Sequence, residues 1–239
     1  MDNALYTTLA RQSGLLRETQ NIANNIANVS TGGFRRESIV FSEFVNTLGR
    51  DDPALSMATA NVHFTSQEQG ALTQTGGTFD FAIEGEGFFM VEGPNGPLLT
   101  RAGAFTPSEQ GELVTPDGLR LLDAGGAPVF APPDARAVSL AADGTLTADG
   151  RPITELGLFL PANPTDLAHR DGVRFHAPGG VAPVIEGAVI LQGFIESSNV
   201  DAITEIARLI EVQRAYEMGQ TFLDKEDERM RSIFRTIGR

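Results

Sequence analysis

The strongest constraint on the fold of this 239-residue chain is an apolar repeat at each end, with alternating intervals of three and four residues. At the C-terminal end the repeat passes through Leu209, Val212, Tyr216, Gly219, Leu223, Glu226, Met230, Ile233 and Ile237. At the N-terminal end it passes through Leu5, Leu9, Gln12, Leu16, Thr19, Ala23 and Ile26, with Ile22 beside it. A seven-residue repeat is typical of helices that pack side by side in a supercoil. We therefore predict two terminal helices that pair as a coiled-coil stalk.

We define the assembly seam as the large apolar members of these repeats together with Ile22, and we expect these residues to bury their side chains against other subunits. Its residues are Leu5, Leu9, Leu16, Ile22, Ile26, Leu209, Val212, Tyr216, Leu223, Met230, Ile233 and Ile237. The alternative is that both helices pack only on the core of their own domain, as amphipathic helices commonly do. Asn24, Asn25 and Asn28 lie beside the seam, where polar side chains weaken self-sufficient packing and can fix register.

The expected N-terminal helix begins at Asp2 and ends near Asn28, a length of about 39 Å. It ends before Gly32 and Gly33, and we expect the chain to reverse at Gly33 with a positive φ angle. The expected C-terminal helix begins with Ser198 as its N-cap and reaches Ile237.

The middle of the chain has a different pattern. Residues 34–75 show no sustained period, so we expect an extended or looped connector with a short helix near 42–48. From residue 76 the chain alternates short apolar strands with glycine turns, as in Phe79, Phe81 and Ile83, whose spacing predicts one buried face. The expected organisation is a helix in 1–33, the connector in 34–75, an all-β body made of hairpins in 76–196, and a helix in 197–239. The predicted fold class is α+β.

Composition excludes several classes of function. The net charge is −13 and there is neither cysteine nor tryptophan, so thiolate metal sites and a basic nucleic-acid surface are not expected. No apolar run is long enough to span a lipid bilayer, and the first residues do not form a cleavable secretory signal.

No candidate active site emerges, and we expect no cofactor and no metal. His63, His169 and His176 lie far apart without the spacing of metal ligands, and we expect the latter two at the surface. An acidic β-rich secreted hydrolase stays open as an alternative, because one sequence does not exclude a catalytic carboxylate pair.

Several motifs, in order along the chain, resemble those of the bacterial flagellar rod and hook proteins. At the N-terminus the resemblance rests on Asn24, Asn25, Asn28, Gly33, Phe34 and the residues around them. Before the C-terminal helix it rests on Ser198, Asn199 and Val200. The segments 70–89, 100–105, 111–115 and 213–217 are similar to further family blocks. Residues 1–6, 35–38 and 237–239 resemble the proximal-rod member more than the distal-rod member, and the short middle disfavours the hook protein.

The resemblance implies a structural subunit of the basal-body rod and not an enzyme. Its terminal helices would form the axial core of a tube that spans the periplasm and transmits motor torque. The implied partners are copies of itself, other proximal- and distal-rod proteins, and the flagellar type III export apparatus, which exports subunits without a cleaved signal peptide. A distal-rod or hook subunit is the alternative within the family. We also expect the terminal segments to be largely disordered before assembly, because their seams then lack partners.

Overall fold

The computed structural model describes residues 2–46, 55–184 and 187–237, which form two units. Unit 1 contains the two terminal helices and residues 37–66. Unit 2 contains residues 28–36 and 67–200. Two helices and a β-rich middle confirm the α+β class.

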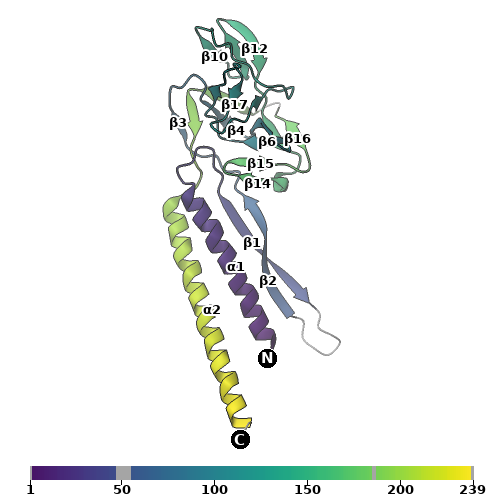
Figure 1. Cartoon of the computed structure of the whole chain (residues 1–239), viewed down its shortest axis with the longest axis vertical. Helices are drawn as coiled ribbons and strands as arrows, with labels where there is room; N and C mark the ends of the chain where they lie inside the picture. Colours follow the sequence, from purple (N-terminus) through teal and green to yellow (C-terminus); the bar gives the residue numbers. More distant parts are fainter. Residues whose placement is uncertain (1, 47–54, 185–186, 238–239) are drawn as a thin grey trace. The chain divides into compact units, whose positions relative to one another are not determined.

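In unit 1, helices α1 (Asp2–Ala27) and α2 (Ala202–Ile237) lie side by side, and the antiparallel strands β1 (Glu37–Asn46) and β2 (Leu55–Thr65) lie against α1 (Figure 1). Successive contacts show that the helices are antiparallel, since Gln12 bonds to Tyr216 whereas Glu18, further along α1, pairs with the earlier residue Arg208. Among the described residues, neither helix contains a stretch long and apolar enough to cross a lipid bilayer.

Unit 2 is built from short strands in several small sheets. Its largest sheet has the order β14-β15-β6-β5-β9, and β4 pairs with β17 and β3 with β18. The strands are β3 (Leu72–Gln74), β4 (Phe81–Gly85), β5 (Phe89–Gly93), β6 (Gly96–Thr100), β7 (Thr106–Pro107), β8 (Leu113–Val114), β9 (Leu121–Leu122), β10 (Val138–Leu140), β11 (Thr145–Ala148), β12 (Arg151–Glu155), β13 (Phe159–Pro161), β14 (Ala168–Asp171), β15 (Arg174–His176), β16 (Val181–Pro183), β17 (Ala188–Gln192) and β18 (Phe194–Glu196). A 3-10 turn, η1 (Pro164–Asp166), precedes β14.

Strand β5 separates two apolar cores of unit 2. Phe89 and Val91 belong to one core, whereas Met90 and the preceding Phe88 belong to the other. Successive strand residues point to opposite faces, so a strand between two cores is buried on both.

Strand β4 buries Phe81 and Ile83 on one face, and on its other face Ala82 is buried whereas Glu84 is exposed. The expectation of a single buried face therefore fails at Ala82, because alternation does not reveal a small residue packed against the second face.

Residues 42–46 belong to strand β1, so the short helix expected there is absent, and residues 47 and 48 lie outside the described residues. Pairing with β2 over the whole of β1 supplies hydrogen bonds that a local helix would have made. Residues 37–66, expected to be a connector, belong with the helices, whereas 28–36 belong to unit 2.

Helix α2 is capped by Asp201 and not, as predicted, by Ser198. The Asp201 carboxylate accepts a hydrogen bond of 2.7 Å from the backbone N–H of Thr204, the third residue of the helix, which is the usual geometry of an N-cap. The Ser198 hydroxyl instead accepts a bond of 3.2 Å from the N–H of Val200, in the turn that precedes the helix.

Candidate assembly surface

Helices α1 and α2 share a small apolar core. Leu15 and Ile22 of α1 and Val212 of α2 are buried in it, with exposed fractions of 8%, 3% and 2%. Partly buried residues packed against these three are Ile26, Leu209, Ala215 and Tyr216. The pair is thus held by few fully buried side chains, and each contributes about 1.5–3 kcal/mol of hydrophobic stabilisation.

Polar contacts fix the register of the two helices. The Gln12 amide donates a 2.9 Å hydrogen bond to the backbone carbonyl of Tyr216. The Arg208 guanidinium pairs with Glu18 at 2.7 Å, and this hydrogen bond raises the pKa of Arg208. Because bonds of this kind need specific partners, they select one alignment among those that the apolar contacts would allow.

Asn25 joins three elements of unit 1. It is fully buried; its Nδ2 donates to the backbone carbonyl of Glu37 at 2.8 Å, and its Oδ1 accepts from the N–H of Glu37 at 3.0 Å. The same Nδ2 lies 3.2 Å from a carboxylate oxygen of Glu205 in the first turn of α2. Sequence reasoning placed Asn25 beside the helical seam but did not find Glu37 or Glu205 as its partners.

The structure divides the predicted seam into covered and uncovered parts. Ile22 and Val212 are buried, and Ile26, Leu209, Tyr216 and Leu223 are partly buried. The exposed members are Leu9 at 56%, Leu16 at 50%, Met230 at 39% and Ile233 at 38%. The side chains of Leu5 and Ile237 lie outside the described residues. The role of all twelve residues in assembly stays a prediction.

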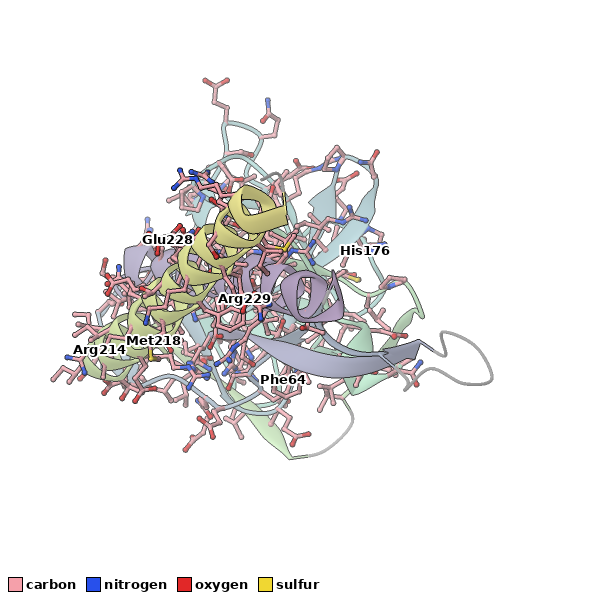
Figure 2. The ribbon with its side chains drawn as sticks, turned by 90° about the horizontal axis from the view of Figure 1, so that it is seen from below. Phe64, His176, Arg214, Met218, Glu228 and Arg229 are labelled. Carbon is pink, nitrogen blue, oxygen red and sulfur yellow. The ribbon has the colours of Figure 1, made fainter. Side chains whose placement is uncertain are left out.

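Unit 1 exposes more apolar side chains than these four. Ile203, Ile206 and Ile210 lie on α2 at intervals of three and four, so they form a second apolar stripe on that helix. Met218 and Phe222 are exposed further along α2, and Figure 2 shows Met218 on the same side of the helix as Arg214. Extended apolar surface of this kind marks an interaction site more often than a free surface.

The Gly33 prediction is confirmed, since its φ is +72°. Its N–H donates a 2.7 Å bond to the carbonyl of Glu196, and a Cβ at this position would overlap the backbone N of Ala102. Gly33 is therefore required both for its backbone conformation and for this close approach.

The other residues of the resemblance lie around Gly33 in unit 2, except two residues of α1, the exposed Asn24 and the buried Asn25. Phe34 is buried and lies edge-on to the ring of His169 at 6.2 Å. Asn199 accepts a 2.6 Å bond from the N–H of Arg36 and donates one of 2.7 Å to the carbonyl of Glu68. Asn28 accepts a bond from the Thr31 hydroxyl, and Val200 is buried.

Sequence reasoning missed a buried ionic cluster in unit 2. Glu196 pairs with Arg35 at 3.1 Å and with Arg101 at 3.0 Å, and all three side chains are at most 3% exposed. Glu196 also accepts a 2.9 Å bond from the N–H of Gly70. Burial lowers the pKa of Arg35 to about 10, and the charge of Glu196 opposes this shift. Burial likewise lowers the pKa of Arg101.

The described residues contain no group of three or more His, Asp or Glu side chains that could hold a metal ion. His169 and His176 lie on the neighbouring strands β14 and β15 and are half-buried, so they are less exposed than expected. The side chain of His63 lies outside the described residues. What the chain offers is apolar helical surface.

Comparison with known proteins identifies the family of the chain that carries this surface. Residues 82–148 match the flagellar hook protein FlgE/F/G D1 domain, and residues 191–236 match the flagellar basal body rod FlgEFG protein C-terminal domain. The flagellar basal-body rod protein FlgF of Rhizobium meliloti is 35% identical over 241 residues, which cover 100% of this chain and 99% of the relative. The FlgF of Caulobacter vibrioides is 37% identical over 100% of this chain and 99% of its own length. The chain belongs to the flagellar basal-body rod protein family.

Within the rod protein family, the FlgF relatives are more similar to this chain than the FlgG relatives are. The flagellar basal-body rod protein FlgG of Agrobacterium fabrum is 33% identical over 87% of this chain and 88% of its own length. The D1 match covers strands β4 to β11 of unit 2, and the C-terminal match covers β18 and nearly all of α2. The C-terminal match thus covers the helix that carries most of the exposed large apolar side chains described in unit 1.

Proposed function

We propose that this chain is a structural subunit of the proximal rod in the bacterial flagellar basal body. The observation that carries the proposal is the similarity to FlgF rod proteins over the full length of the chain. The exposed apolar residues of α1 and α2 support a subunit that polymerises through its terminal helices. In the rod these helices would continue their pairing as a coiled-coil stalk.

The same geometry accounts for a mechanical role. Helices that pack lengthwise on several neighbours distribute shear over many side chains, and close-packed apolar interfaces are only weakly compressible. A tube built this way would transmit motor torque across the periplasm. Its partners would be copies of itself, other proximal- and distal-rod proteins, and the flagellar type III export apparatus. This apparatus would export the chain without a cleaved signal peptide.

A structural role implies that the chain is not an enzyme and needs no cofactor. The hydrolase alternative receives no support from the comparisons, whose named relatives are rod proteins. A distal-rod or hook role is the remaining alternative, and the higher identity to FlgF than to FlgG argues against the former.

The direct test is to delete the gene and to complement it with tagged full-length chain or with chains that lack residues 2–27 or 202–237. We expect the full chain to restore motility and to copurify with basal bodies, whereas both truncated chains fail in both respects. Image reconstruction of the complemented basal bodies then gives the position of the tagged chain along the rod axis. A motile deletion strain, or a tagged chain absent from functional basal bodies, would contradict the proposal.

A further inference from the structure

Unit 1 contains a groove of about 320 Å³ between α1 and α2. Its apolar wall consists of Leu15, Ala215, Met218 and Phe222, and Arg11 and Gln12 supply polar atoms. Met218 is 66% exposed and Phe222 41% exposed. The groove can therefore take up apolar side chains of a second molecule, because large side chains at its rim are not covered by the chain itself.

Gln12 adds a specific requirement to this groove. Its side chain is 6% exposed, and the bond from its Nε2 to the Tyr216 carbonyl fixes the orientation of the amide. Its Oε1 is buried and has no hydrogen-bond partner among the described residues. A buried acceptor without a donor costs about 1–3 kcal/mol, so an occupant that brings a donor is favoured.

Gly219 makes room for this arrangement. A Cβ at Gly219 would overlap the Gln12 amide. The glycine thus lets Gln12 cross between the helices, which holds the unpaired oxygen at the groove.

The same chain carries a segment that matches the groove. We define the α2 extension as residues 227–233, which lie beyond the part of α2 that α1 covers, as Figure 1 shows. Its Met230 and Ile233 continue the spacing of Val212 and Tyr216, the residues that pack on α1, yet they are 39% and 38% exposed. The apolar face that packs on α1 therefore continues beyond the end of α1.

Polar groups of the α2 extension also match the groove. Its two guanidinium groups, Arg229 and Arg231, offer donors of the kind that Gln12 Oε1 lacks.

We propose that the groove between α1 and α2 receives the α2 extension of a second copy of this chain. The inference rests on the proposed function and specifies its contact. Groove and extension are different surfaces of one molecule, so the contact is head-to-tail and can propagate from copy to copy. Met230 lies 12 positions after Met218, and Ile233 lies 11 after Phe222. If the helices are parallel, Met230 and Ile233 of one copy lie on Met218 and Phe222 of the next copy. Successive copies are then shifted by about 17 Å along the helix axis.

The absence of cysteine from the natural chain allows a clean cross-linking test in purified basal bodies. The double variant Met218→Cys, Met230→Cys should form disulfide-linked dimers and higher multimers on oxidation, and each single variant should form none. The matched control Met218→Cys, Ile203→Cys should also form none. Ile203 is 81% exposed, so a cysteine there is accessible, but it lies far from the α2 extension. The pair Phe222→Cys, Ile233→Cys tests the same contact at the neighbouring position.

A photo-crosslinking phenylalanine analogue at Met218 provides the second measurement. Mass spectrometry of the products should identify the peptide of residues 226–235 from the same protein. If both cysteine pairs are present in the rod without multimers, or if the photo-adduct is a peptide of another rod protein or a lipid, the inference is overturned. Those results leave the proposed function intact, which instead fails if the unmodified chain is absent from basal bodies.

Discussion

The side-chain amide of Asn25 makes the two hydrogen bonds to Glu37 that the backbone of a neighbouring strand would make. Its oxygen accepts from the Glu37 N–H at 3.0 Å and its nitrogen donates to the Glu37 carbonyl at 2.8 Å. The first residue of β1 is thus attached to α1 by a helix side chain. A carboxamide suits this position because it carries a donor and an acceptor on one planar group.

We expect Asn25→Asp to destabilise unit 1 although it conserves size and shape. A carboxylate has no donor for the Glu37 carbonyl, and it would repel Glu205, which lies 3.2 Å from Asn25 Nδ2. The loss should be about 1–3 kcal/mol in the free energy of unfolding, with faster hydrogen exchange at the Glu37 amide. Asn24→Asp on the exposed side of α1 is the matched control, and equal effects of the two substitutions would refute this role of Asn25.

Gly33→Ala should destabilise the chain more than Gly76→Ala. Both glycines have nearly the same φ, +72° and +71°, so both substitutions cost about 1–2 kcal/mol of backbone strain. A Cβ on Gly33 would also overlap the backbone around Ala102, whereas a Cβ on Gly76 meets nothing within 4 Å. Denaturant unfolding of both variants separates strain from overlap, and similar losses would show that the close approach is unimportant.

Glu196→Gln tests the buried ionic cluster. The substitution leaves the guanidinium groups of Arg35 and Arg101 without a counter-charge in a buried site, which typically costs about 3–5 kcal/mol. The control is Glu92→Gln, whose partner Arg120 lies at 2.6 Å in an exposed pair and should change the unfolding free energy little. A Glu196→Gln protein as stable as the Glu92→Gln protein would mean that the cluster contributes no net stabilisation.

The terminal repeat predicted two paired helices, but it did not predict which leucine of α1 faces α2. Leu15 is 8% exposed and Leu16 50% exposed, although the heptad placed Leu16 in the seam. A straight helix drifts about 20° per heptad from the ideal repeat, so two adjacent leucines compete for the interface and the partner helix decides. Sequence indicated the hairpins of unit 2 more directly, since turns such as Asp149-Gly150 are local and both residues have positive φ.

The buried cluster was beyond sequence reasoning for a different reason. Arg35 and Glu196 are 161 positions apart and meet only through the folded backbone. Nothing in the local pattern distinguishes them from solvated charges. The pairing of β1 with β2 is similar, because a strand depends on a partner that lies elsewhere in the chain.

Leu16→Asp and Val212→Asp should separate assembly from folding. Leu16 is exposed on α1, so its substitution should change the unfolding free energy of the isolated chain by no more than about 0.5 kcal/mol, yet prevent incorporation into basal bodies by placing a charge in a desolvated interface. Val212 is 2% exposed, and its substitution should destabilise the helix pair by roughly 3 kcal/mol. Gln20→Asp, also exposed on α1, is the control. Normal incorporation of Leu16→Asp, measured by immunoblotting of purified basal bodies, would remove Leu16 from the assembly seam.

Hydrogen exchange on the isolated chain should show weak protection in α1 and α2 and strong protection in β5. The helix pair has three fully buried apolar side chains at its core, whereas β5 lies between two larger apolar cores. Local opening is easiest where few apolar contacts are lost, so the helices should exchange by opening while unit 2 stays closed. The same amides measured in assembled rods should become protected, because neighbouring subunits then cover Leu9, Leu16, Met230 and Ile233. If the helices of the isolated chain exchanged as slowly as β5, the terminal seams would not need other subunits, and ordering on assembly would be refuted.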